Sequence, residues 1–289
     1  MKISATYFAL LIGLIGGLNE RAWGQAIPIN TDVAIQPAEG QIIYRNQLRY
    51  RSFDLDDLDA DVTTWMQSNV LVYGWSSRFS TALGVPLIRR DFEAEGRATD
   101  ELDTGIGDIT LLLRYQLWKK LGHLESQTWT VLGGLQIPAY DDPISSRSWD
   151  PIVGTIYSWH KNRHGVDADI TYHLNTENDR DFKAGDVLRY DLAYQYRLLP
   201  ARYEDVSTDK PWSLTGLLEL NGEYQQKSES DGRRLDETDG HQLFLSPGLA
   251  LTRKRTQFEA ALQFPVYQNA GDRAAEDNVR AVLGFTITF

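Results

Sequence analysis

The fold of this chain is decided most clearly by residues 186–198, whose sequence is DVLRYDLAYQYRL. Apolar and aromatic side chains occupy every second position, at Leu188, Tyr190, Leu192, Tyr194, Tyr196 and Leu198. Polar side chains occupy positions between them, at Arg189, Asp191, Gln195 and Arg197. Successive side chains of a β-strand point to opposite faces of the sheet. The pattern therefore predicts a strand with one apolar face and one wet face.

The same alternation returns at residues 108–117 and along most of the chain, whereas no long stretch has helical periodicity. We count about twelve such segments, near the roughly ten-residue length of a strand that crosses a bilayer at a tilt. They begin near Gln41, Val62, Arg78, Gly105, Gln127, Pro151, Gly165, Val187, Trp212, Gln242, Gln257 and Asn278. The sequence therefore predicts an all-β fold, a transmembrane antiparallel up-and-down β-barrel.

The connections between these segments alternate in length. Short ones lie at residues 75–77, 161–164 and 253–255. Longer acidic ones lie at residues 54–61, 91–103, 140–150, 175–186, 226–240 and 268–278. Bacterial barrels have short periplasmic turns and long external loops. We therefore expect the acidic loops to be external.

The N-terminus has the features of a secretory signal peptide. Lys2 precedes an apolar run from Tyr7 to Leu18, and small residues follow at Ala22, Gly24 and Ala26. The apolar run is shorter than the roughly 20 residues of a spanning helix. We expect residues 1–26 to be the signal peptide, with cleavage after Gly24 or Ala26, and residues 27–289 to be the barrel. The expected location is the outer membrane, with its lipid and lipopolysaccharide as partners.

Composition agrees with a membrane barrel and argues against other classes of protein. The 289 residues include 8 Trp, 14 Tyr and 10 Phe, and many of these aromatic residues fall near predicted strand ends, where barrels carry girdles. The net charge of −11 argues against a nucleic-acid partner. The absence of cysteine excludes disulfides and thiol chemistry.

Charged residues in the strands should face the interior, because Arg at mid-membrane on the lipid face costs about 2–4 kcal/mol. By alternation the basic interior residues are Arg45, Arg49, Arg51, Arg114, Arg189, Arg197 and Arg280. The acidic ones are Asp108, Asp167, Asp169, Asp191, Glu219, Glu223 and Glu259. The alternation allows two readings: the charges pair across the lumen to satisfy one another, or they line a pore. We take Arg45, Arg49, Arg114, Arg189, Arg197, Asp108, Asp191, Glu219 and Glu223 as candidate pore-lining residues.

The last strand ends the sequence, with apolar residues alternating from Val279 to Phe289. A strand that finishes in Phe is similar to the signal that barrel-assembly machinery reads. We expect Phe285, Ile287 and Phe289 to form that signal, with the assembly machinery as a partner.

Five segments resemble the family of outer-membrane proteins of the MetA-pathway of phenol degradation. They are TGIGDIT at 104–110, LLELNGEY at 217–224, HQLFLSPGL at 241–249, QFPVYQ at 263–268 and VLGF at 282–285. The resemblance covers most of the chain beyond the signal peptide and is strongest after Trp212. It implies an outer-membrane channel or transporter for small molecules, possible substrates being hydrophobic or aromatic compounds.

Two other functions stay open at this point. An enzyme similar to the omptin proteases needs paired aspartates facing an Asp–His pair, for which Asp141, Asp142, Asp239 and His241 are candidates. A barrel that acts on lipids needs a serine–histidine pair, and no such motif is present. The second alternative is a plugged barrel with a structural role.

No cofactor or metal site is expected. Gly105 and Gly107 lack the third glycine and the helix of a phosphate-binding loop, so we interpret them as glycines of a barrel strand. His160 and His164 lie in a basic stretch that we interpret as a solvated turn.

Overall fold

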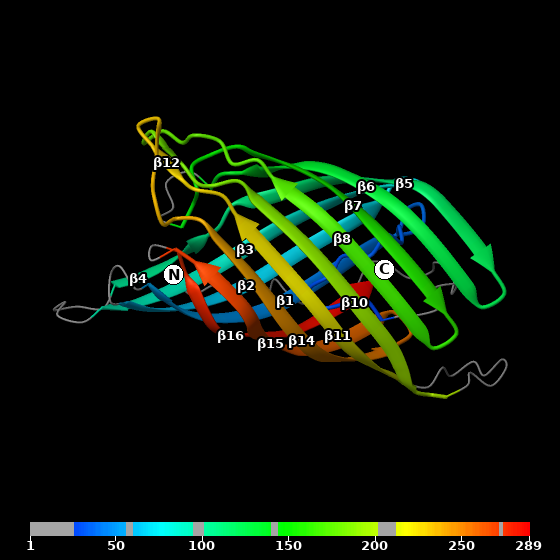
Figure 1. Ribbon diagram of the computed structural model, residues 1–289. Coiled ribbons are helices and arrows are strands. Elements are labelled where there is room, and N and C mark those ends of the chain that lie inside the picture. Colours follow the sequence, from blue (N-terminus) through cyan, green and yellow to red (C-terminus); the bar gives the residue numbers. More distant parts are fainter. Residues whose placement is uncertain (1–25, 56–59, 95–100, 140–143, 202–211, 272–273) are drawn as a thin grey trace, which may run out of the picture.

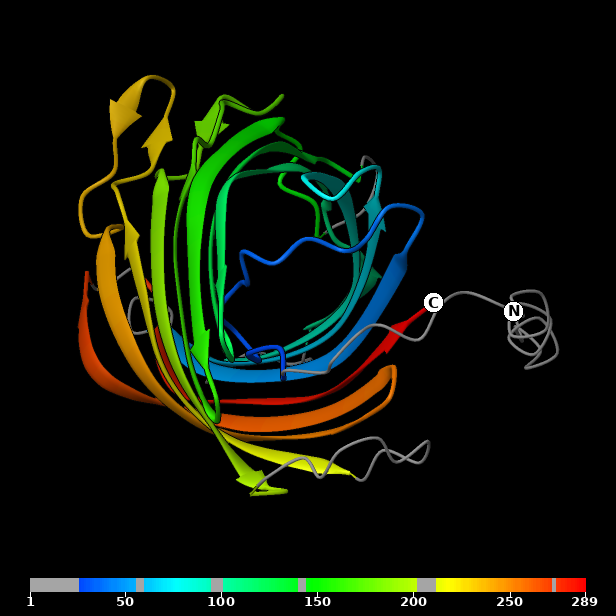
Figure 2. The same ribbon diagram turned by 90° about the vertical axis from the view of Figure 1, so that its right-hand side faces the viewer.

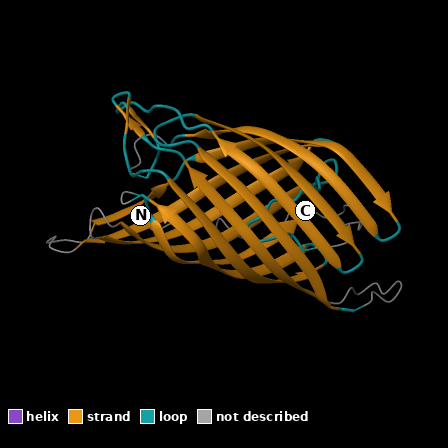
Figure 3. Ribbon diagram, viewed as in Figure 1, coloured by secondary structure: helices purple, strands orange, loops and turns teal. Residues whose placement is uncertain are grey.

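The computed structural model describes residues 26–55, 60–94, 101–139, 144–201, 212–271 and 274–289. Over these residues the chain is built of strands and loops, and its main sheet closes on itself (Figure 1). Figure 3 shows no helix in this part of the chain. Accordingly, the described residues contain no helix of the length and apolar character that crossing a membrane requires.

The wall strands follow the predicted segments closely. They are β1 (Ile42–Leu55), β2 (Ala60–Gly74), β3 (Phe79–Ala94), β4 (Glu101–Ile106), β5 (Ile109–Gly122), β6 (Glu125–Ile137), β7 (Asp150–Lys161), β8 (His164–His173), β10 (Val187–Leu199), β11 (Ser213–Gln225), β14 (Gly240–Arg253), β15 (Thr256–Ala270) and β16 (Glu276–Thr288). Because β4 and β5 both pair with β3 and are separated only by Gly107 and Asp108, they form one of twelve wall strands. The predicted strand count is confirmed.

Every neighbouring pair of wall strands is antiparallel, and the first strand closes the ring against the last. Residues of β1 pair with β2 on one side and with β16 on the other. Closure brings Ile43 opposite Thr288, and the amide of Phe289 donates to the carbonyl oxygen of Ile42 at 2.8 Å. A closed sheet has no edge, so each strand finds hydrogen-bond partners within the barrel wall.

The two faces of the wall differ as the alternation predicts. Leu192 is 47 % exposed on the outer face and Leu283 is 60 % exposed. Glu219 and Asp167, on the inner face, have no exposed surface. The apolar residues therefore surround the barrel and the charged ones fill it, which is the arrangement a lipid environment requires.

The two ends of the barrel also differ. Short connections join β5 to β6, β7 to β8 and β14 to β15, and we call this the turn end. Longer connections lie at the opposite end, called the loop end, where β9 (Phe182–Lys183), β12 (Glu229–Ser230) and β13 (Arg233–Arg234) form a separate small sheet. In Figure 1 this small sheet carries the label β12 and projects beyond the wall strands at the loop end. The connection at 202–211, long for the turn end, lies outside the described residues.

Large aromatic side chains are exposed near both ends of the wall. Trp75 (56 %), Trp129 (47 %) and Trp212 (42 %) lie towards the turn end. Trp65 and Tyr224, 41 % and 42 % exposed, lie towards the loop end. Indole and phenol rings suit the boundary between lipid and water, because one side of each is apolar and one atom is polar.

Candidate functional site

The interior of the barrel is crossed by the chain itself. Residues 26–39, which we call the strap, run inside the wall before β1 begins (Figure 2). Ile29 and Ala34 of the strap have no exposed surface. Ile29 and Ala26 pack with Leu217, Ala250 and Val282 of the wall. The strap therefore occupies part of the lumen.

The strap leaves the lumen beside a glycine that makes room for it. The amide of Gly40 donates to the carbonyl oxygen of Gly74 at 2.8 Å, at the turn end of β2. A Cβ atom at position 74 would collide with the carbonyl oxygen of Ala38. A side chain at this position would push the strap off the wall, so glycine is needed here for a close backbone approach.

Glu219 on β11 holds the centre of the strap. Its carboxylate accepts hydrogen bonds from three successive amides, those of Ile29 (2.7 Å), Asn30 (2.9 Å) and Thr31 (2.8 Å). The hydroxyl of Thr31 donates a fourth bond at 2.9 Å. Burial of a carboxylate is costly without such partners, and charge-assisted bonds of this kind are stronger than neutral ones. Glu219 is thus an anchor for backbone donors.

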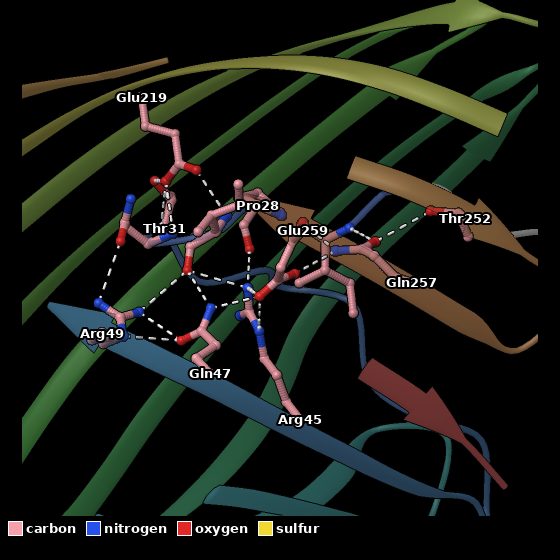
Figure 4. A network of polar contacts seen from close by, with 12 residues as sticks. Pro28, Thr31, Arg45, Gln47, Arg49, Glu219, Thr252, Gln257 and Glu259 are labelled. Atoms are coloured by element: carbon pink, nitrogen blue, oxygen red, sulfur yellow. Dashed lines mark hydrogen bonds and ion pairs between the residues drawn. The ribbon is translucent and has the colours of Figure 1, made fainter. Parts of the chain in front are cut away.

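Glu259 on β15 and Arg45 on β1 hold the segment before that centre (Figure 4). Arg45 donates two bonds to Glu259, at 2.7 and 2.9 Å, and one to the carbonyl oxygen of Pro28 at 2.6 Å. Gln257 both accepts from the amide of Ile27 at 2.8 Å and donates to its carbonyl oxygen at 2.9 Å. The side-chain amide of Gln257 therefore replaces a strand partner for Ile27.

The other half of the strap is held by β5, β6, β7 and β8. Asp169 accepts from the amide of Asp32 at 2.7 Å, and Ser158 accepts from that of Ala34 at 2.9 Å. The hydroxyl of Thr130 donates to the carbonyl oxygen of Ala34 at 2.6 Å, and Arg114 donates to that of Val33. Buried backbone groups need partners, and here wall side chains supply them.

The candidate pore-lining residues therefore have three different placements. Arg45, Arg114 and Glu219 bind the strap. Arg49, Arg189, Asp191 and Glu223 line a cavity of about 410 Å³ on the loop side of the strap. Of these, Arg49 also donates to Asn30 and to the carbonyl oxygen of Ile29 in the strap. Asp108 and Arg197 lie elsewhere, as described next. The charges that pair do so along the wall and not across the lumen: Arg189 and Glu223 are opposite each other on the neighbouring strands β10 and β11, at 2.8 Å. Arg45 on β1 reaches Glu259 on β15 past the one strand between them, at 2.7 Å.

Asp108 anchors a loop that joins β6 to β7. Its carboxylate accepts from Ser145 Oγ at 2.8 Å, from the amide of Ser146 at 3.1 Å and from Gln136 Nε2 at 2.9 Å. Arg197 lines a small hollow near the turn end, with Gln195 and Ser213. The structure does not bring Arg197 together with Arg189.

A second cavity, of about 190 Å³, lies on the turn side of the strap. It is lined by Ile27 and Val33 of the strap and by Lys254, Arg255 and Thr256 at the turn between β14 and β15. Asn30 of the strap lines the larger cavity on the loop side. The strap thus separates two hollows in the same lumen.

The sequence did not predict the strap, because nothing within residues 26–39 indicates which part of the chain they contact. The only charged side chains of the strap are Asp32 and Glu39. One signal was present: Glu219, Glu259 and Asp169 face the lumen. Buried carboxylates need hydrogen-bond donors, and backbone amides can supply them as well as arginines.

The prediction of a solvated turn for His160 is wrong. His160 lies on β7, is 3 % exposed and faces Asp167 Oδ2 at 3.2 Å inside the lumen, because the strand continues to Lys161. His164 lies on the outer face, where Nδ1 is 2.7 Å from the hydroxyl of Tyr194. The described residues contain no group of three or more His, Cys, Asp or Glu placed to hold a metal ion.

His241 faces outward as well. Its Nε2 lies 2.7 Å from the hydroxyl of Tyr190, and its ring packs against those of Tyr224 and Tyr267. Asp141 and Asp142 lie outside the described residues. Since His241 belongs to the outer surface, it cannot serve as the histidine of a site inside the barrel mouth.

Comparison with known proteins gives both a sequence family and a shared fold. The family model for the MetA-pathway of phenol degradation matches residues 44–282. Among curated proteins, none matches the sequence. The COG4313 outer membrane channel from Pseudomonas putida F1 is similar with a TM-score of 0.68 at 16 % identity, over 92 % of this chain and 100 % of that one. This similarity shows a common fold.

Two further barrels are more distant. The β domain of the Bordetella autotransporter BrkA has a TM-score of 0.49 at 11 % identity, over 87 % of this chain and 100 % of that one. The NanC porin has a TM-score of 0.42 at 12 % identity, over 85 % of this chain and 98 % of that one.

Proposed function

The chain belongs to the family of the MetA-pathway of phenol degradation, and from that membership we propose that it is a passive channel for small molecules, hydrophobic or aromatic compounds among them. The barrel is an outer-membrane protein: its sheet is closed, its outer surface is apolar and its interior is polar. The channel through it is narrow, because the strap occupies the lumen.

The two cavities on either side of the strap carry this proposal. A barrel of twelve strands is wider than the eight-stranded size that side chains alone can fill. Here the strap fills the middle of the lumen, and cavities of about 410 Å³ on its loop side and 190 Å³ on its turn side remain. The permeating molecule passes between these hollows along the strap. This geometry supports a low conductance in place of the large conductance of an open porin.

The hydrogen bonds of the strap also suit a channel better than a permanent plug. The backbone amides of Ile27, Ile29 and Asp32 donate to side chains of the wall and not to the backbone of a neighbouring strand. Local displacement of a few strap residues therefore leaves every wall strand paired. The plugged structural barrel is the competing function, and it predicts a wild-type protein that does not conduct.

We propose no catalytic role for the barrel. The enzyme alternative placed Asp239 and His241 at the external mouth of the barrel, whereas the ring of His241 contacts Tyr190 and Tyr224 on the outer face of the wall. Incubation with peptide and phospholipid substrates tests this point. Hydrolysis that is lost with His241→Ala would support an enzyme.

The apolar outer face is proposed to contact lipid and lipopolysaccharide, and the last strand is proposed to contact the assembly machinery.

Residues 1–26 are proposed to be the signal peptide. Residues 1–25 lie outside the described residues. Ala26 packs inside the lumen, 6 % exposed. Of the two cleavage positions, the one after Gly24 keeps Ala26 in the mature chain. Mass determination of the mature N-terminus distinguishes the two positions.

Planar-bilayer recording of the purified barrel tests the channel function. Wild type should give small discrete current steps, and a variant lacking residues 27–37 should give steps several-fold larger. Asp231→Ala, in the small sheet at the loop end, is the matched control and should behave as wild type. A silent wild type with a conducting deletion variant would favour the plugged barrel, and silence of both would refute a channel.

A further inference from the structure

The larger cavity is surrounded by four guanidinium groups. Arg49 and Arg51 come from β1, Arg189 from β10 and Arg280 from β16. The cavity holds about 410 Å³, within the range of roughly 300–1,000 Å³ that is typical of small-molecule sites. Four strong donors around one hollow of this size are the first indication of a ligand.

Three of these arginines are already paired with carboxylates. Arg51 and Arg280 share Asp277, with Nε to Oδ1 distances of 2.6 and 2.9 Å. Arg189 donates to Glu223 at 2.8 Å. Because one aspartate serves two arginines, this side of the cavity has more guanidinium groups than contacting carboxylates.

Arg49 is the arginine that contacts no carboxylate among the described residues. Its bonds go to Gln47 Oε1 at 2.7 and 3.1 Å, to Asn30 Oδ1 at 3.3 Å and to the carbonyl oxygen of Ile29 at 3.3 Å. The nearby carboxylates Glu219 and Glu259 are engaged by the strap and by Arg45. All of these acceptors of Arg49 are neutral, so its charge is uncompensated by direct contact.

The carboxylates around the cavity leave Arg49 without a direct partner. The lining itself contains four arginines and the carboxylates of Asp191 and Glu223, and Asp277 lies behind two of the arginines. The cavity therefore presents one guanidinium that no carboxylate of the described residues contacts. Carboxylates are the ligands that a planar guanidinium binds best, with two parallel hydrogen bonds.

The remaining lining is mixed. Asn30, Asn221 and Gln263 contribute amide groups, and Met66 of β2 contributes an apolar side chain that is half-buried. Phe244 also borders the cavity, but it is 1 % exposed and the guanidinium of Arg280 stacks over its ring at 4.0 Å. A ligand here therefore meets guanidinium and amide groups together with the side chain of Met66.

We propose that this cavity binds a small organic carboxylate with an apolar body, its carboxylate at Arg49 and its body against Met66. The proposal rests on the channel function and names the substrate class of that channel. A monocarboxylate supplies the contacting carboxylate that Arg49 lacks. A neutral molecule of the same shape leaves the charge of Arg49 uncompensated.

Calorimetric titration of the folded barrel in detergent, at low ionic strength, tests this inference with benzoate as the probe. Benzyl alcohol is the neutral probe of similar size. Wild type should bind benzoate, and Arg49→Gln should weaken binding by about tenfold or more, as expected for loss of a charge-assisted pair. Arg89→Gln is the matched control, because Arg89 is an exposed arginine of β3 outside the cavity that pairs with Asp91.

Because Arg49 also bonds to the strap, Arg49→Gln could weaken binding by displacing the strap. A second variant separates this effect from the loss of the charge. Arg189 lines the cavity but bonds to Glu223 and not to the strap, so Arg189→Gln should also weaken benzoate binding. Equal affinity of wild type and both variants, equal binding of benzyl alcohol, or no benzoate binding at all would overturn the inference. Conductance of the same preparations separates the two proposals. A barrel that conducts but does not bind benzoate refutes the carboxylate site and leaves the channel function standing.

Discussion

Glu219 Oε2, on β11, accepts hydrogen bonds from both the amide nitrogen of Thr31 at 2.8 Å and its hydroxyl at 2.9 Å. The two residues are separated by 188 positions in the chain. This contact joins the strap to the wall at a carboxylate with no exposed surface. Glu219 is therefore one of the wall side chains, with Gln257 and Asp169, that hold the strap by its backbone.

Glu219→Gln should loosen the strap. A glutamine presents an NH₂ group to the amide donors of Ile29, Asn30 and Thr31, so charge-assisted bonds worth about 1.5–3 kcal/mol each are lost or weakened. We expect larger and noisier current steps in planar bilayers. Glu229→Gln, at the loop-end sheet, is the control and should leave the current unchanged. Wild-type currents in Glu219→Gln would show that the strap does not limit conduction.

Arg189→Ala should shift the channel towards cations. The substitution leaves Glu223 without its partner at 2.8 Å and enlarges the cavity that both residues line. Conductance should rise, and the reversal potential in a KCl gradient should move in the cation-selective direction. The double variant Arg189→Ala/Glu223→Ala removes both charges and should return the reversal potential to near the wild-type value. If both variants shift it equally, the pair does not set selectivity.

The loop end should be outside the cell and the turn end in the periplasm. This orientation follows from the lengths of the connections. Asp231 lies in the turn between β12 and β13 and Lys254 in the turn between β14 and β15, and both positions are exposed. Each is replaced by cysteine in a separate variant. An impermeant thiol reagent added to intact cells should label only Asp231→Cys. Labelling of Lys254→Cys alone would reverse the orientation.

Deletion of Phe289 should slow assembly of the barrel. Its amide donates to the carbonyl oxygen of Ile42 and so makes the last bond of the closing strand pair. Phe285 lies four residues earlier, in β16, and its ring centre is 6.0 Å from that of Tyr44 on β1. Loss of Phe289 should reduce the outer-membrane yield of heat-modifiable protein, and combined loss with Phe285→Ala should reduce it further. An unaltered yield in the double variant would contradict an assembly role for these residues.

The wall could be predicted from the sequence because alternation is a local property. Whether Tyr190 faces lipid and Asp191 faces the lumen follows from their neighbours within one strand. The predicted starts of all twelve segments lie within four residues of the observed ones, the largest difference being Gly105 against Glu101. The predicted strand ends were less accurate than the predicted faces of the side chains. Polar residues that continue a strand beyond the membrane do not alternate with apolar ones, so no pattern marks where the strand ends.

The sequence by itself determined that this chain is a membrane barrel, how many strands it has and which side chains point inward. Only the tertiary structure decided what the inward side chains meet. Glu219, Glu259 and Asp169 lie on three different strands, and closure of the ring brings them around the same short strap. The strap, residues 26–39, has no periodicity of its own, because its backbone is bound by side chains from many strands and not by one neighbouring strand. Its position depends on contacts between residues more than 100 positions apart, and such contacts leave no pattern within a local stretch of sequence.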